Sequence, residues 1–600
     1  MSSQRTTNRE ISVHHKIIVG VDYGTTYSGV AFATTNTLSW QDIVLVSKWP
    51  GNPDTAWKTP SIIAYASENE KFKFPRNQYG YQVTQAHKQY AWTKLQLEGS
   101  IDRTEHDDPL LEHLYGTTFS ESPNLPPNKS AKDVVQDYLT EIYHYSMQYL
   151  KLRLGAPVVD IFPIECWITM PAIWSDRAQQ LTREAALGAG FGSRPRDKVK
   201  MISEPEAAAL YALKPFLTSA ATFPLKVGQH VLVCDCGGGT IDLITYEIVR
   251  TEPLVHKEIC RGSGGKCGST FIDRRFLVWM GKTFGDAYFS VDSKKRGPGS
   301  TFMRSFDTAK KDFGRKGDEK EQYYVEPIIM NVDNEELYDK EDQTVKIPRD
   351  TMKEFFDPGV DTCIKLVEDQ ASQLKKKTNT QIDRVILVGG FGASPYLNTK
   401  LEEWCNRSGI AHFTSPEDCQ AAIVKGAVLR GLEGVRPISI IAKRHYGWCW
   451  GEPFREGIDD ENDAYIDEFD QRKYCADRMH WTVSKGQELD RNFKLNRGVS
   501  QTLGSNAKEI ASEVSLFSCR LDNAPEHLKT SDVRLEGTIK TRLSLERASR
   551  KKVSSQSGKT IYQFSYQVEV DFRSEEGVLA FRSFGNGIEE GMASITFESW

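Results

Sequence analysis

The sequence lacks the features that mark a membrane, secreted or nucleic-acid-binding protein. No stretch approaches the ~20 apolar residues that a bilayer-spanning helix requires, and the opening segment MSSQRTTNREISVHHK contains no apolar run of signal-peptide length. The 11 cysteines are scattered and form no CxxC pairs of the zinc-site type. The net charge of −5 shows no excess of basic residues of the kind that nucleic-acid-binding proteins have. We therefore expect a cytoplasmic protein with neither nucleic acid nor a membrane as its partner.

Glycine, in contrast, is concentrated in two similar segments. With 600 residues the chain is long enough for several domains, because one hydrophobic core stops growing at roughly 250–300 residues. Near the N-terminus VGVDYGTTYSGVAF, and from Val231 VLVCDCGGGTIDL, each predict a strand, an Asp, a turn of glycine and hydroxyl residues, and a second strand. Asp22 and Asp235 are too far apart for a short repeat array, so two half-domains of similar build are expected.

These turns are suited to binding phosphate. Consecutive glycines let backbone N–H groups converge on an anion, and threonine hydroxyls add donors. A single turn of this kind is more often an ordinary hairpin. Two copies that face each other would hold a polyphosphate from both sides. Asp22 and Asp235 would then bind Mg²⁺ through its waters, because this ion dehydrates reluctantly.

Four segments carry a resemblance to a known family. VDYGTTYSGVAF, CDCGGGTIDL, SEPEAAALYAL and VILVGGFGASPYL resemble the phosphate, connecting and adenosine motifs of the heat-shock protein 70 family, over about residues 16–433. The resemblance implies an α/β fold, an actin-like two-lobed ATPase domain of duplicated half-domains, with ATP or ADP and Mg²⁺ between the lobes. Lobe I is expected at about 16–225 and lobe II at about 226–433, after a flexible arm of residues 1–15.

The resemblance also assigns roles to individual residues. The residues expected to act in catalysis are Asp22, Thr25, Lys94, Glu204, Asp235 and Asp242. The phosphate-binding residues are expected to be Gly24, Thr25, Thr26, Tyr27, Gly237, Gly238, Gly239, Thr240 and Gly268. The ribose and adenine would be bound by Asp307, Lys310, Lys311, Gly314, Gly389, Gly390 and Phe391.

Lys94, in AWTKLQL, is the candidate for a positive charge near the γ-phosphate, as phosphoryl transfer requires. The alternative is a solvated lysine on a partly exposed helix. Glu204 would orient Mg²⁺ or the attacking water. Two departures from the family concern the adenine: Ala393 stands where an arginine is expected, and Lys311 replaces another. Planar stacking on the base would be weaker, with Phe391 taking over part of the packing.

The last part of the chain departs further from the family. From about 436 to 600 the sequence predicts a β-rich domain, and YQFSYQVEVDF shows period-two patterning from Tyr562 to Phe572. The leucine-rich acidic linker and helical lid of typical members have no counterpart in the sequence, so the resemblance is to a divergent, lidless branch. This domain is a candidate module for binding a substrate or partner.

The leading hypothesis is a slow Mg²⁺-dependent ATPase whose nucleotide state controls binding of a peptide or protein client. A co-chaperone or exchange factor would be a further partner. The alternative is a nucleotide-sensing scaffold that binds ATP or ADP with negligible hydrolysis. A small-molecule kinase of the same fold is disfavoured by the β-rich domain and by the chaperone-like details of the motifs.

Overall fold

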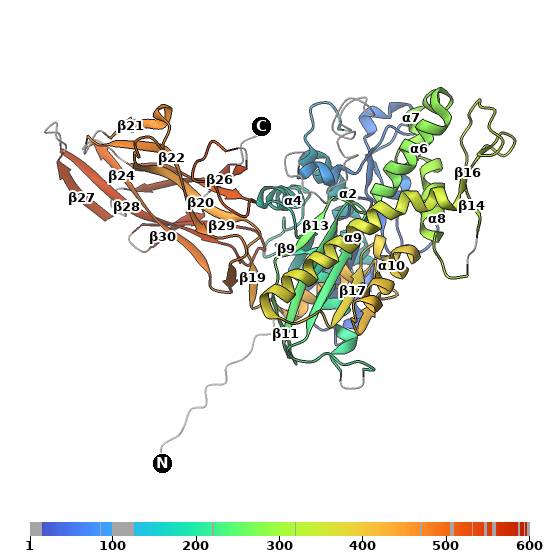
Figure 1. Ribbon diagram of the computed structural model, residues 1–600, viewed down its shortest axis with the longest axis horizontal. Coiled ribbons are helices and arrows are strands. Elements are labelled where there is room, and N and C mark those ends of the chain that lie inside the picture. The colour runs from blue at the N-terminus through green and yellow to red at the C-terminus, as the bar shows by residue number, and fades with distance from the viewer. Residues whose placement is uncertain are drawn as a thin grey trace, which may run out of the picture.

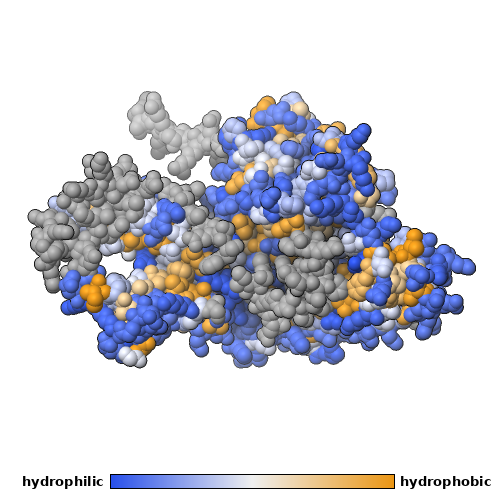
Figure 2. Space-filling view, turned by 90° about the horizontal axis from the view of Figure 1, so that it is seen from above, coloured by the Kyte–Doolittle hydropathy of each residue, from blue (hydrophilic) through white to orange (hydrophobic). Residues whose placement is uncertain are grey.

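The computed structural model describes residues 15–596 apart from 85, 99–124, 219–220, 318–319, 468–470, 505–508, 531, 545–548, 555–559, 586–587 and 593. A larger α/β part and a smaller β part lie side by side (Figure 1). The face in Figure 2 is mostly hydrophilic, with hydrophobic residues visible in the hollow between the two parts. Within the described ranges, every helix is too short or too polar to traverse a bilayer.

Two sheets of the same strand order form the centre of the α/β part. The first has the order β3-β2-β1-β8-β9, with strands β1 (Ile17–Asp22), β2 (Tyr27–Thr34), β3 (Val44–Leu45), β8 (Ile164–Met170) and β9 (Lys198–Ser203). The second has the order β12-β11-β10-β17-β18, with strands β10 (His230–Cys236), β11 (Ile241–Thr251), β12 (Leu254–Glu258), β17 (Arg384–Val388) and β18 (His412–Thr414). In each sheet two strands form an antiparallel hairpin, and two further strands of the sheet pair in parallel beside its first strand. The duplication predicted from the sequence is confirmed.

Two helices pack against each other between the sheets. They are α5 (Glu204–Ala212), capped by the hydroxyl of Ser203, and α11 (Ala422–Glu433). Their small side chains join residues of both sheets, such as Ile18 and Val231, in one buried core. Gly426 is required at the crossing, because a Cβ there would lie 1.7 Å from the carbonyl oxygen of Ala207.

Further helices cover the outer faces and bury separate cores. On lobe I these are α2 (Ala131–Leu154), α3 (Ala156–Ile161) and α4 (Asp176–Gly188). On lobe II they are α6 (Thr270–Phe289), α7 (Ser293–Arg296), α8 (Thr301–Asp312), α9 (Arg349–Thr378) and α10 (Pro395–Arg407). Short strands complete the part: β4 (Thr59–Pro60), β5 (Ile62–Ala64), β6 (Gln78–Tyr79), β7 (Tyr90–Ala91), β13 (Ser263–Gly265), β14 (Gln322–Val325), β15 (Tyr338–Asp339) and β16 (Thr344–Pro348).

The β part is a sandwich of two sheets. One contains β20 (His445–Pro453), β21 (Ala464–Ile466), β22 (Lys473–Val483), β25 (Glu509–Cys519), β26 (Val533–Ser544) and β31 (Ser594–Thr596). The other contains β24 (Lys494–Gly504), β27 (Ser549–Ser554), β28 (Thr560–Asp571), β29 (Ala580–Gly585) and β30 (Ile588–Met592). Phe564, Tyr566, Val568 and Val570 of β28 are buried between the sheets, as the alternating pattern predicts.

The segment between the two parts contacts both lobes. It forms β19 (Ser439–Ile441), which pairs with β23 (Glu488–Asp490). On lobe II, the amide of Ile438 donates to the carbonyl of His256 at 2.9 Å, and the amide of Ile441 to Glu258 Oε2 at 2.9 Å. On lobe I, Lys443 Nζ donates to the carbonyl of Ala172. The β part itself contacts lobe I, where Tyr446 donates to Asp176 at 2.8 Å.

His256 makes the stability of this junction sensitive to pH. Its ring is fully buried, and neither ring nitrogen has a hydrogen-bond partner among the described residues. Burial, followed by the charges of Arg430, Arg491 and Arg573, lowers the pKa of His256 to about 3. The unfolded chain therefore binds a proton below about pH 6.5 that the folded chain does not, so stability falls as the pH drops through this range.

We expect His256 to lower the free energy of unfolding by about 2 kcal/mol at pH 5 compared with pH 7.5. The loss amounts to about 1.4 kcal/mol for each pH unit below 6.5. A His256→Leu variant should lack this component. Urea unfolding of both proteins at the two pH values measures the difference. Equal pH dependence in the two proteins would contradict the assignment.

Candidate functional site

The turns at the ends of β1 and β10 meet across a cleft of about 620 Å³. A Cβ at Gly239 would lie 2.3 Å from Thr25 Oγ1, and one at Gly238 would lie 2.3 Å from Thr26 Oγ1. The two turns therefore approach more closely than they could if Gly238 or Gly239 were replaced by any other residue. Glycine at these positions leaves the backbone amides accessible from the cleft, as a site for phosphate groups requires.

All but three of the residues singled out from the sequence line this cleft. They are Asp22, Gly24, Thr25, Thr26, Tyr27, Lys94, Glu204, Asp235, Gly237, Gly238, Gly239, Thr240, Asp307, Lys310, Lys311, Gly389, Gly390 and Phe391.

The remaining three lie behind the lining and support it. Asp242 is buried below the second turn and accepts a hydrogen bond from the amide of Ile173 at 2.9 Å. The amide of Gly268 donates to the carbonyl of Gly239 at 3.2 Å, which fixes the second turn from outside. Gly314 has φ of +80° and packs against Tyr396, where a Cβ would collide with the tyrosine backbone.

Buried carboxylates gather in the cleft beside the two turns. Asp22, Glu204 and Asp235 are all at most 6% exposed. Asp235 Oδ1 has no hydrogen-bond partner among the described residues. Burial, together with the charges of Glu204, Asp242 and Asp22, raises the pKa of Asp235 well above its usual range. A divalent cation would remove this electrostatic cost, and carboxylate oxygens are the donors that Mg²⁺ prefers, so the residues present fit this ion.

Lys94 forms a buried ion pair with Glu204. It belongs to a short 3-10 helix, η5 (Thr93–Leu97), and its Nζ lies 2.6 Å from Glu204 Oε1. With Lys94 only 3% exposed, the alternative of a solvated surface lysine is wrong. Burial raises the pKa of Glu204 to about 7, against the lowering effect of Lys94. Glu204 can therefore gain or lose a proton near neutral pH, which suits a general acid or base.

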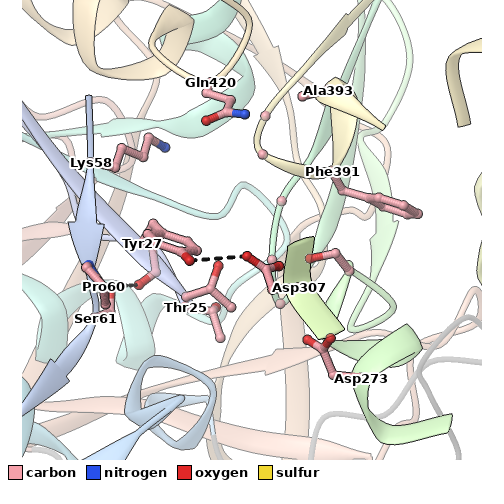
Figure 3. Close-up of a pocket in the computed structure, with 18 of the residues that line it drawn as sticks. Thr25, Tyr27, Lys58, Pro60, Ser61, Asp273, Asp307, Phe391, Ala393 and Gln420 are labelled. Carbon is pink, nitrogen blue, oxygen red and sulfur yellow. Dashed lines mark hydrogen bonds between the residues drawn. The ribbon is translucent and has the colours of Figure 1, made fainter. Parts of the chain in front are cut away.

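A second lysine in the cleft was missed by the sequence analysis. Lys58 Nζ lies 2.5 Å from Asp22 Oδ2, and its side chain is 12% exposed. Figure 3 shows this side chain pointing into the cleft from the strand side. Burial alone would lower the pKa of Lys58, but the charge of Asp22 raises it, so the ammonium stays charged. No pattern in AWKTPSII distinguishes this residue from a surface lysine.

Asp307 organises the opposite end of the cleft. It accepts a hydrogen bond from Tyr27 at 3.3 Å (Figure 3) and lies 3.2 Å from Lys310 and 2.6 Å from Lys311. Burial acts to raise the pKa of Asp307, but the two lysines hold it below its usual range. Lys310 also pairs with the buried Asp273 at 2.7 Å, a residue that the sequence analysis did not single out.

Most of the Phe391 ring, which is expected to pack on the adenine, is turned away from the cleft, and two arginines line the cleft. Phe391 is 4% exposed and packs toward Phe356, with 6.4 Å between ring centroids, so most of its ring is turned into lobe II. Arg304 and Arg315 also line the cleft, and neither was singled out from the sequence. A guanidinium of this kind can stack on a base where Ala393 cannot.

Comparisons with known proteins identify similar chains. The model of the Hsp70 protein family matches residues 135–442, a range that includes Glu204, the second turn and Gly389–Gly390. Human heat shock 70 kDa protein 12A is 24% identical over 593 residues, covering 84% of this chain and 82% of that protein. Human heat shock 70 kDa protein 12B is 24% identical over 69% of this chain and 68% of its own. The chaperone protein DnaK of Thermosipho melanesiensis is 25% identical over 72% of this chain and 62% of its own.

Proposed function

Because the chain belongs to the Hsp70 family, whose members bind ATP or ADP with Mg²⁺, we propose that it is a slow Mg²⁺-dependent ATPase. In this proposal the nucleotide state of the cleft controls how the β part binds a peptide or protein. The observation that carries the proposal is the meeting of two glycine turns above buried carboxylates, one of which has an oxygen with no hydrogen-bond partner in the part of the chain that the structure describes.

The cleft residues divide into two groups by the part of the nucleotide that each would contact. At the phosphate end, Asp22 and Asp235 would hold Mg²⁺ through its waters, and the ion would neutralise charge on the phosphate oxygens. Backbone amides of residues 238–240 and the hydroxyls of Thr25 and Thr26 would donate to the phosphates, whereas the amide of Gly237 already donates to the carbonyl of Thr240 at 2.9 Å. At the other end, Asp307, Lys310 and Lys311 would bind the ribose and base.

Hydrolysis would depend on the buried pair of Lys94 and Glu204. The ammonium of Lys94 supplies a fixed positive charge in a site with little water, where it stabilises developing negative charge most effectively. Glu204 would orient the attacking water and accept its proton, consistent with a pKa of about 7. Both side chains are positioned before nucleotide binds, because the ion pair fixes one against the other.

A short series of contacts supports coupling between the cleft and the β part. Asp242, behind the second turn, accepts from the amide of Ile173 at 2.9 Å. The carbonyl oxygen of Ile173 accepts a hydrogen bond from Arg520 of the β part at 3.2 Å. Movement of the second turn on nucleotide binding would therefore be transmitted to the β part through one residue of lobe I. The proposed coupling requires that this series of contacts have two alternative arrangements.

A single-turnover experiment tests the proposal. Protein in excess over labelled Mg–ATP should bind the label and convert it slowly to ADP. Asp235→Ala should lose hydrolysis and weaken Mg–nucleotide binding by at least about tenfold, since it removes a carboxylate that would hold the ion through its waters. Asp235→Asn keeps the shape of the side chain, and circular dichroism of both variants checks their folding.

Each outcome distinguishes the hypotheses. Hydrolysis that disappears in the Asp235 variants supports an ATPase, whereas equal hydrolysis in all proteins indicates a contaminating enzyme. Binding without hydrolysis in the unmodified protein would favour the nucleotide-sensing scaffold and withdraw the roles given to Lys94 and Glu204. Failure to bind nucleotide would contradict both hypotheses.

A further inference from the structure

A second cavity, of about 1050 Å³, lies where the two lobes, the connecting segment and the β part meet. Lobe II contributes residues 259–264 and 266 and the C-terminal end of α9, and lobe I contributes Ile173 and Trp174. The connecting segment contributes residues 441, 443 and 444, and the β part contributes 485–486 and 520–521. The cavity therefore exists only when the β part is docked on the lobes.

Basic side chains dominate the lining. Two lining residues are acidic, Glu98 and Asp369, and eight are basic: Arg261, Lys266, Lys376, Lys377, Lys443, Arg444, Lys485 and Arg520. The protein as a whole has a net charge of −5, so this accumulation runs against the composition of the chain. Low-dielectric walls strengthen the field of such a cluster inside a cavity.

The ion pairs around the cavity do not neutralise it. Arg444 pairs with the buried Glu536 at 3.0 Å, and Arg520 lies 3.6 Å from Glu98. Lys485 and Arg261 share one carboxylate, Asp522, whose side chain is 88% exposed and screened by solvent. Among the lining residues the basic groups outnumber the acidic ones by four to one, and the carboxylates of Glu536, Glu258 and Asp522 offset part of this charge from outside the lining.

Part of this positive charge is built into the protein interior. Lys266 is 5% exposed and Arg444 is 3% exposed, although both line the cavity. Burial of a cation is costly unless negative charge is close; Glu536 supplies it to Arg444, and an anion bound in the cavity would add to it.

We propose that this cavity binds a compact, multiply phosphorylated small molecule. The basic groups come from five separate segments and surround one space, which favours a compact anion over an extended acidic peptide. Three of them are arginines, whose planar guanidinium groups bind phosphate oxygens in pairs. The anion would hold the β part against both lobes, since it would contact residues of all of them. This proposal does not depend on the ATPase activity proposed above.

The cavity is distinct from the nucleotide cleft but shares a boundary with it. Trp174 lines the second cavity, and the centroid of its ring lies 5.4 Å from the Nζ of Lys94 in the cleft. Ile173, which also lines the cavity, donates to Asp242 behind the second turn. A test must therefore show that a phosphorylated probe is not simply bound in the nucleotide cleft.

Calorimetry with myo-inositol hexakisphosphate as the probe, with and without saturating Mg–ATP, provides this test. The double variant Lys376→Gln/Lys377→Gln removes two exposed lining charges for which no ion pair is observed among the described residues. It should weaken probe binding by about tenfold or more, because each lysine would make a charge-assisted contact. The control Lys294→Gln/Lys295→Gln removes the same charge from the exposed helix α7, outside both cavities, and should leave binding unchanged.

Three results would overturn the proposal. The first is absence of probe binding to the unmodified protein. The second is binding that Mg–ATP abolishes and that the Lys376/Lys377 variant leaves unchanged, which would assign the probe to the nucleotide cleft. The third is tighter binding of a decaglutamate peptide than of the probe, with the same dependence on Lys376 and Lys377, which would make the cavity a site for acidic protein segments.

Discussion

Replacing Lys94 by methionine should lower the single-turnover rate of ATP hydrolysis by about 10²–10³-fold, the usual effect of removing one preorganised group that stabilises the transition state. Methionine fills nearly the same volume, and Glu204 can become neutral once its partner is lost, since its pKa is already raised to about 7. Nucleotide affinity should change by less than about threefold, because the phosphate-binding turns are untouched.

Lys311→Met provides the matched control at the other end of the cleft. Lys311 pairs with Asp307, and its Nζ lies 5.0 Å from the centroid of the Tyr27 ring. Its loss should weaken nucleotide binding and leave the rate of hydrolysis of bound ATP nearly unchanged. A Lys94→Met protein that hydrolyses bound ATP at the normal rate would exclude Lys94 from catalysis.

The second large effect concerns stability, and it follows from the crossing of α5 and α11. Gly426→Ala would place a Cβ 1.7 Å from the carbonyl oxygen of Ala207, so the two helices would have to separate. Alanine improves helix propensity by about 1 kcal/mol, whereas overpacking against backbone costs about 3 kcal/mol. The sum predicts that the free energy of unfolding falls by about 2 kcal/mol or more.

Urea unfolding of the full chain measures this loss, and Gly498→Ala is the control. At Gly498, on β24, a Cβ would meet no atom within 4 Å. The same substitution there should change the free energy of unfolding by less than about 0.5 kcal/mol. Because α5 begins at Glu204, the Gly426 variant should also hydrolyse ATP more slowly. An unchanged free energy of unfolding would show that the helices can move apart at little cost.

The sequence carried strong local signals for the parts of the fold that repeat or that need special residues. Asp22 and Asp235 at equivalent strand ends indicated the duplicated sheets. Alternation along β28 indicated the sandwich. These features are local, since each depends on a few neighbouring residues, so they could be recognised without knowledge of the tertiary structure.

Other features arise only when distant segments meet. Lys58 became part of the cleft through its contact with Asp22, and Asp273 through its contact with Lys310. Arg261 and Lys376 lie far apart in the sequence and meet through the fold of lobe II, and Arg520 joins them only because the β part docks on the lobes. The pairing of β24 with β28 across the intervening strands is likewise a long-range choice of register. No local pattern marks such residues.

The segment from 438 to 443 has a kinetic consequence. It is hydrogen-bonded to lobe II through Ile438 and Ile441 and to lobe I through Lys443, so it spans the same two bodies that must separate to open the cleft. Opening would break these bonds, and the same bonds keep the β part in place. Escape of a bound molecule from the cleft and release of the β part would then cross one common barrier, and a change that accelerates one would accelerate the other.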